Sequence, residues 1–225
     1  MTIAKARHLD VKSKRYNRFA TGLPDVRNHD SSFDSFKHSV LIVLGSGGHT
    51  SEMFLMLQDG VDGFKSMHRH YLVSNGDTRS ITAMEHFETE LTSKFSTSGN
   101  SYVHLVCRAR QVHQSWVSTP RTAITSCAEI FPLLQYLRPD IILTNGPGTG
   151  YIAGFVAHLL KMLGLVSSSK LQVLYIESWA LVKTLSLSGK FFYHSNIADL
   201  MLVQHETVAQ LYNLPNAGWM VAPLQ

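Results

Sequence analysis

A short glycine-rich segment behind an apolar run combines features suited to anion binding and to proton transfer. Glycines allow a tight turn and leave backbone N–H groups open, and a helix that begins directly after such a turn attracts phosphate. The histidine in the segment belongs to the residue type that titrates nearest neutral pH, which suits it to proton transfer. The alternative is an ordinary strand-to-helix turn with a solvated histidine. The segment follows Val40–Leu44 and consists of Gly45, Ser46, Gly47, Gly48, His49 and Thr50.

The residues after these glycines predict a helix whose N-cap is the hydroxyl of Thr50 or Ser51. A second glycine loop, at positions 146–150, opens another expected helix. It offers a second place where an anion would meet backbone amides. The residues that we assign to this second anion site are Asn145, Gly146, Gly148 and Thr149.

The first glycine loop differs from two common nucleotide-binding motifs. Thr50 stands where the dinucleotide fingerprint has its last glycine, and no acidic residue ends the second expected strand to bind a ribose. The chain also has no Gly-Lys-Ser/Thr sequence, which excludes a Walker loop. We therefore expect no NAD-type cofactor and no other cofactor.

Charged residues follow two further expected strands. Arg108 and Arg110 lie two positions apart, so they point the same way if the chain stays extended, and two guanidinium groups suit a diphosphate. A solvated loop is the alternative. Glu177 is a candidate base, hydroxyl ligand or arginine partner, and a plain salt bridge to Arg108 or Arg110 is its structural alternative. No metal-ligand spacing is present, so we expect no metal site.

Apolar runs alternate with helical patterns from position 39 onward, which predicts an α/β fold. We expect a Rossmann-like parallel sheet with helices on both faces. Ligands gather at the carboxyl ends of the strands in such folds, so the polar loops described above should form one site. The expected strands are 39–44, 70–74, 102–106, 140–144, 172–176 and 199–203. The expected helices are 50–59, 79–94, 121–137, 150–164 and 204–212.

Charge and hydropathy divide the 225 residues into an arm and a domain. Residues 1–37 contain eight Lys or Arg and four Asp, which supplies the whole net charge of +4. We predict a disordered basic arm there, solvated or resting on an anionic membrane, and a single Rossmann-like domain at 38–225. Because the charge lies in the arm, it does not indicate a nucleic-acid partner. Residues 151–166 come nearest to a membrane span, but they are too short and predict a buried helix with a partly apolar outer face.

The chain contains six motifs in this order: Gly45–Met53, Arg108–Trp116, Asn145–Thr149, Tyr175–Ser178, Thr184–Lys190 and Asp199–Gln204. Their combination and spacing closely resemble one protein family over about residues 38–225. It is the membrane-recruiting, acceptor-side subunit of the eukaryotic two-subunit UDP-N-acetylglucosamine (UDP-GlcNAc) transferase of dolichol-linked oligosaccharide synthesis. This family is similar to the N-terminal half of a GT-B glycosyltransferase, such as the bacterial enzyme that makes the lipid disaccharide precursor of peptidoglycan. In that bacterial relative the first glycine loop carries a histidine, and a glutamate takes the position of Glu177.

The resemblance implies a transferase subunit that adds the second GlcNAc to dolichyl-diphosphate-GlcNAc on the cytosolic face of the endoplasmic reticulum. A small partner subunit would supply the UDP-sugar-binding half. The 22 residues after position 203 are too few for that half, so we expect the chain to be inactive alone. His49 and Glu177 would be catalytic, while the glycine loops, Arg108 and Arg110 would hold the lipid diphosphate.

Family members typically carry an N-terminal membrane-spanning helix, and residues 1–37 contain no apolar run of that kind. The basic arm and the helix near 150–166 are therefore the expected membrane contacts. Two other functions stay open: a non-catalytic anchor that binds only the partner and the lipid head group, and a free-standing nucleotide-sugar or dinucleotide enzyme.

Overall fold

The computed structural model describes residues 38–95, 99–109, 119–146, 148–168 and 170–220. The predicted arm at 1–37 and Arg110 lie outside these residues. The described strands are β1 (Ser39–Val43), β2 (His68–Ser74), β3 (Ser101–Val106), β4 (Ile141–Thr144), β5 (Gln172–Ile176) and β6 (Leu200–Leu202). The helices are α2 (Gly48–Asp59), α3 (Val61–Phe64), α4 (Thr78–Lys94), α5 (Thr119–Leu137), α6 (Gly148–Met162), α7 (Leu187–Ser195) and α8 (Glu206–Tyr212).

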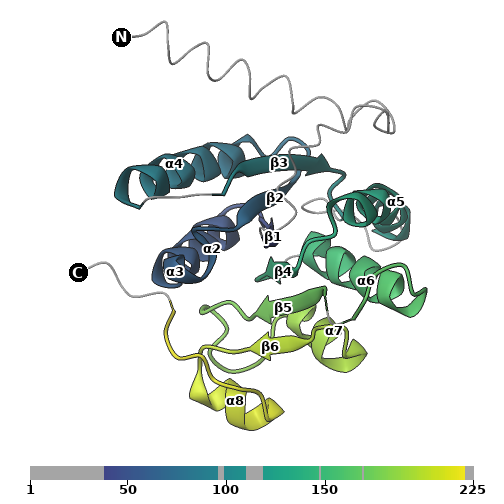
Figure 1. Cartoon of the computed structure of the whole chain (residues 1–225). Coiled ribbons are helices and arrows are strands. Elements are labelled where there is room, and N and C mark those ends of the chain that lie inside the picture. Colours follow the sequence, from purple (N-terminus) through teal and green to yellow (C-terminus); the bar gives the residue numbers. More distant parts are fainter. Residues whose placement is uncertain (1–37, 96–98, 110–118, 147, 169, 221–225) are drawn as a thin grey trace, which may run out of the picture.

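The six strands form one parallel sheet in the order β3-β2-β1-β4-β5-β6 (Figure 1). The chain builds outward from β1 to β3 and then returns to place β4 on the other side of β1. The carboxyl ends of β1 and β4 thus meet at a topological switch point, where open α/β sheets bind their ligands. The predicted Rossmann-like parallel fold is confirmed.

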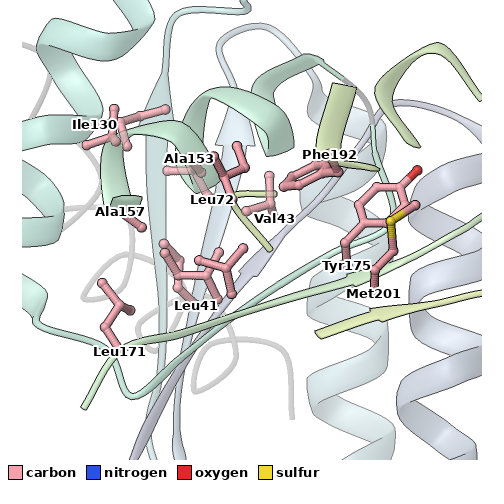
Figure 2. Packing of buried hydrophobic residues seen from close by; sticks show 14 of the residues in the cluster. Leu41, Val43, Leu72, Ile130, Ala153, Ala157, Leu171, Tyr175, Phe192 and Met201 are labelled. Carbon is pink, nitrogen blue, oxygen red and sulfur yellow. The ribbon is translucent and has the colours of Figure 1, made fainter. Parts of the chain in front are cut away.

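Helices cover both faces of the sheet, with α2, α3 and α4 on one face and α5, α6 and α7 on the other (Figure 1). Side chains of β1 alternate between the two resulting cores, as the pleat of a strand requires. Leu41 and Val43 pack with α5, α6 and α7, and Figure 2 shows this cluster with Ala153 and Phe192. Ile42 packs in the other core, with residues of α2 and α4. Burial on both faces explains why β1 carries no charge.

Two helices were not predicted, the short α3 and the longer α7. Ser186 caps α7 by accepting a hydrogen bond from the Gly189 N–H at 2.9 Å, and Asn196 ends the helix in the left-handed conformation. The prediction for α6 is confirmed: it packs one face into the core and leaves Phe155 exposed on the other. No helix in the described part of the chain is both long and apolar enough to cross a membrane.

Two buried histidines on neighbouring strands make the fold sensitive to acid. His70 Nδ1 on β2 lies 3.0 Å from His104 Nε2 on β3, and the side chains are almost fully buried. Burial, with His104 and His68 nearby, lowers the pKa of His70 to about 3, and burial lowers the pKa of His104 to about 4. Both side chains therefore stay neutral in the folded protein at pH values where a solvated histidine is already charged.

We expect the free energy of unfolding to fall as the pH drops from about 6.5 toward 4, because the unfolded chain then binds protons that the folded chain excludes. Each such histidine contributes a slope of about 1.4 kcal/mol per pH unit in this window. His70→Gln should reduce the slope of the unfolding free energy against pH by about the contribution of one bound proton. Denaturant unfolding at several pH values measures this slope. His86→Gln, at an exposed site on α4, is the matched control. Equal slopes in both variants would contradict the prediction.

Candidate functional site

The loops after β1 to β5 lie at the carboxyl edge of the sheet, as the sequence predicted for the two glycine loops, Arg108 and Glu177. Side-chain contacts join them: the Asn145 Nδ2 donates to the His49 backbone oxygen at 2.9 Å, which ties the loop after β4 to the start of α2. The Ala109 N–H donates to the Thr149 Oγ1 at 3.4 Å, which ties the loop after β3 to the start of α6. Both glycine loops therefore lie beside the switch point between β1 and β4.

Buried hydroxyl groups fix the first glycine loop. Thr50 donates to the Gly45 backbone oxygen, and its Oγ1 lies 2.7 Å from the Ser80 Oγ at the start of α4. The prediction that Thr50 or Ser51 caps α2 is wrong. The cap position is Gly47, with φ of 64°, and it makes no side-chain hydrogen bond. Thr50 lies inside the helix, and its hydroxyl points back to fix the loop.

The N-terminus of α2 is consequently open toward the site. Ser46, Gly47 and Gly48 are exposed, and the first turn of the helix carries no acidic residue. The first turn of α6 likewise carries none, and Gly146 before it has a φ of 90°. Two helix N-termini whose first turns carry no acidic residue thus lie at the same edge of the sheet, which is an arrangement that favours a bound anion.

His49 lies at the rim of the first glycine loop. Its side chain is 38% exposed, but Nδ1 is buried and has no hydrogen-bond partner among the described residues. Nδ1 lies 3.9 Å from the Glu52 Oε2. Because Nδ1 is the buried ring nitrogen, the solvent-facing edge of the imidazole carries Nε2, and this atom is the one available to a ligand.

Glu52 is a buried carboxylate that we did not assign to the site from the sequence. It is 4% exposed, and its Oε1 accepts hydrogen bonds from the Trp179 N–H at 2.6 Å and the Gln204 Nε2 at 3.3 Å. Its Oε2 lies 3.5 Å from the Asn145 Nδ2. The available signal was its spacing: a residue three positions after His49 shares a helix face with it.

Arg108 also lies at this edge, where its Nη2 is 3.8 Å from the Asp77 Oδ2. Asp77 in turn caps α4 by accepting a hydrogen bond from the Ser80 N–H at 3.2 Å. Arg108 is thus held near the glycine loop through Asp77 and Ser80, and its side chain is 27% exposed. The predicted pairing of Arg108 with Arg110 cannot be placed, because Arg110 lies outside the described residues.

Glu177 is buried, with 1% of its surface exposed, and hydrogen bonds occupy both of its oxygens. Oε1 accepts from the Tyr175 hydroxyl and the Ser178 N–H, while Oε2 accepts from the Ser186 N–H and hydroxyl, all at 2.9–3.1 Å. A β-carbon at Gly189 would collide with this carboxylate. The salt bridge to Arg108 that we considered is wrong, because Arg108 pairs with Asp77. The structure places Glu52, and not Glu177, beside His49.

The fold is similar to the Rossmann-like N-terminal half of a GT-B glycosyltransferase. A crystal structure of MurG from Acinetobacter baumannii superposes with a TM-score of 0.53 at 13% identity. The match covers 81% of this chain and 44% of the MurG chain, so the chain spans less than half of that protein. A likeness at this identity establishes the fold alone.

The sequence matches the family model described as "Oligosaccharide biosynthesis protein Alg14 like" over residues 40–221, and the chain belongs to this family. The human "UDP-N-acetylglucosamine transferase subunit ALG14" is 35% identical, over 77% of this chain and 78% of the human protein. The subunit of the same name from Schizosaccharomyces pombe is 37% identical, over 79% of this chain and 80% of its own length. The family expected from the motifs is confirmed.

Proposed function

We propose that this chain is the acceptor-side subunit of a UDP-GlcNAc transferase that adds the second GlcNAc to dolichyl-diphosphate-GlcNAc. The observation that carries the proposal is the placement of His49 in the first turn of α2, at the β1–β4 switch point, where Asn145 from the loop before α6 contacts its backbone oxygen. The names of the relatives support membership in a transferase complex. A small donor-binding subunit supplies the other Rossmann-like half and binds UDP-GlcNAc.

His49 is the general base in this proposal. The 4-hydroxyl oxygen of the acceptor sugar forms a bond to C1 of the donor GlcNAc while the bond from C1 to the UDP oxygen breaks. The hydroxyl proton passes to the exposed Nε2 of His49, and the leaving UDP carries away the electron pair of the broken bond. Base catalysis of this kind contributes on the order of 10²–10⁴-fold to the rate.

The experiment that tests the proposal is GlcNAc transfer by the chain co-expressed with candidate donor-binding subunits, using a lipid-diphosphate-GlcNAc acceptor. The complex should transfer GlcNAc and the isolated chain should not, because the described fold supplies one of the two halves of a GT-B enzyme. Turnover by a preparation in which mass spectrometry detects no partner would contradict the proposal that separate subunits bind the donor and the acceptor. UDP-GlcNAc binding by the isolated chain would favour the free-standing enzyme instead.

The lipid diphosphate binds at the two glycine loops, with Gly45–Gly48 on one side and Asn145, Gly146, Gly148 and Thr149 on the other. Arg108 supplies positive charge beside them. Its partial exposure and its 3.8 Å separation from Asp77 leave N–H groups of the guanidinium available for a phosphate oxygen. Arg110 would add a second guanidinium from the same loop.

Arg108→Ala is expected to raise the KM for the acceptor by about tenfold in the complex and to leave the KM for UDP-GlcNAc nearly unchanged. A lost charge-assisted hydrogen bond is worth about 1.5–3 kcal/mol, which corresponds to a factor of ten or more. Steady-state kinetics with each substrate varied in turn measures both constants. Lys170→Ala, an exposed cation before the amino end of β5, is the control. A rise in the donor KM alone would place the diphosphate elsewhere.

The complex acts at the cytosolic face of the endoplasmic reticulum in this proposal, and the acceptor half meets the membrane. The exposed apolar residues around the C-terminal half of α6 support this contact, since they gather on one helix and the turn after it. They are Phe155, Met162, Leu163 and Leu165. The basic arm at 1–37 would add an electrostatic attraction to anionic lipid.

Floating the chain with anionic liposomes tests the membrane contact. We expect binding at low ionic strength that weakens with salt, because each basic residue near the surface gains about 1 kcal/mol that salt screens. Deletion of 1–37 should weaken the binding, and Phe155→Ser with Met162→Ser should remove the remainder. Ile124→Ser, at an exposed apolar site on α5, is the control. If the folded α6 variant floats like the parent, recruitment depends on another protein.

A further inference from the structure

We propose that Glu52 is a positioning residue that selects the tautomer of His49 in which Nδ1 carries the proton and Nε2 is the acceptor. The inference rests on the proposed function in one respect, that His49 is the base. It assigns a role to Glu52, a residue that was not among the site residues expected from the sequence.

The first observation is how firmly Glu52 is held. Its carboxylate is 4% exposed, and Oε1 is fixed by the Trp179 N–H at 2.6 Å and by the Gln204 side chain at 3.3 Å. A buried carboxylate is costly unless hydrogen bonds and a counter-charge compensate for the lost water. The two hydrogen bonds on Oε1 leave Oε2 facing Asn145 and His49.

The second observation concerns the charges around His49. Asp77 lies beside Arg108, and Glu177 is engaged with the start of α7. Among the residues described, the ion pair that Glu52 makes is with His49, whose Nδ1 lies 3.9 Å from Oε2. The carboxylate that faces His49 is therefore the one three residues further along the same helix.

The third observation is the buried Nδ1, which has no hydrogen-bond partner within the part of the chain that the structure describes. A neutral imidazole has one N–H and one lone pair. If Nδ1 carried the lone pair, that lone pair would lie against a carboxylate oxygen and be repelled. With the proton on Nδ1, the N–H points toward a negative charge, and Nε2 at the exposed edge carries the lone pair that accepts a proton.

The separation of 3.9 Å is longer than a hydrogen bond, whose usual range is about 2.7–3.2 Å. Catalytic hydrogen bonds are often long without substrate and shorten when it binds. Asn145 restricts how the gap can close, because its Nδ2 holds the His49 backbone oxygen at 2.9 Å. The imidazole must therefore turn toward Glu52 while its backbone stays in place.

Glu52→Gln is the variant that distinguishes control of the His49 tautomer from a purely structural role of Glu52. The glutamine oxygen must accept the Trp179 N–H, so the amide nitrogen takes the place of Oε2 and presents N–H groups to Nδ1. The favoured tautomer of His49 then has its lone pair on Nδ1 and its proton on Nε2. In this tautomer Nε2 cannot accept the proton of the acceptor hydroxyl. We expect kcat to fall on the order of 10²–10⁴-fold, with both KM values nearly unchanged.

The direct readout is ¹⁵N NMR of the complex with histidine-labelled chain, in which the signals absent from His49→Gln identify His49. In the parent, the neutral ring should be mainly protonated at Nδ1, and in Glu52→Gln mainly at Nε2. Gln204→Leu is the matched control, because it removes a hydrogen bond from the same carboxylate at 3.3 Å but leaves the charge facing His49. It should keep the Nδ1–H tautomer.

A parent ring protonated mainly at Nε2 would overturn the proposal, and this result needs no variant to fold. An unchanged kcat in folded Glu52→Gln, with the parent complex active, would overturn it as well. Failure of the parent complex to transfer GlcNAc would instead contradict the proposed function. The tautomer spectrum would then still decide whether Glu52 controls His49.

Discussion

Replacing Glu88 by Gln is expected to lower the free energy of unfolding by about 3–5 kcal/mol, a large fraction of the stability of a single domain. Arg69 on β2 is 1% exposed, and its guanidinium contacts both oxygens of Glu88, at 2.7 and 2.9 Å. The Tyr71 hydroxyl donates to the same carboxylate at 2.6 Å. Glutamine has the shape of glutamate without its charge, so the variant leaves a buried cation without its counter-charge. Denaturant unfolding at neutral pH measures the loss.

The control is Glu90→Gln, which removes the charge from an exposed pair with Lys94 on the same helix and should change little. A double variant, Arg69→Met with Glu88→Leu, should be more stable than Glu88→Gln, because it removes the cation together with its partner. If Glu88→Gln unfolds at the same denaturant concentration as Glu90→Gln, the buried pair contributes no more to the free energy of unfolding than a surface pair does, and the prediction is wrong.

The sequence was sufficient for the sheet, because a strand buried on both faces consists mainly of apolar residues, and a charge such as that of Arg69 on β2 occurs there only with a buried partner. Val40–Leu44 shows this directly, and its two neighbours in the sheet are β2 and β4. The same reasoning missed α7, whose Leu-Ser-Gly-Lys sequence resembles a loop. Its start depends on Ser186, which is fixed by Glu177 directly after β5, and such a contact is not visible in the local sequence pattern.

The site was predictable as a location but not as a set of contacts. The switch-point rule brings loops together whatever their sequence, so His49 and Asn145 were expected at one edge. The partners of Glu52 are 127 and 152 positions away in the chain, at Trp179 and Gln204. No local pattern links residues that far apart. Glu177 is bound by Ser186, a contact that the sequence did not reveal, and the catalytic role of Glu177 stays a prediction.

The largest functional effect is expected from His49→Gln in the transferase complex, where kcat should fall on the order of 10²–10⁴-fold. Glutamine keeps a polar side chain at the rim of the glycine loop but has no group that accepts a proton near neutral pH. Both KM values should change little, because the first glycine loop is held by Thr50 and Ser80 and not by the imidazole. Steady-state transfer assays with saturating donor and acceptor measure the loss.

Two further measurements are needed to interpret a fall in kcat of the His49→Gln complex. Size-exclusion chromatography shows whether the partner stays bound, and His86→Gln on α4 controls for the loss of an exposed histidine. A fall in kcat with the complex intact supports a base, whereas loss of the complex alone supports an anchor that only binds its partner. The exposed Nε2 edge and the buried Nδ1 favour the first outcome, because a residue that served only assembly would have no need of a carboxylate behind its ring.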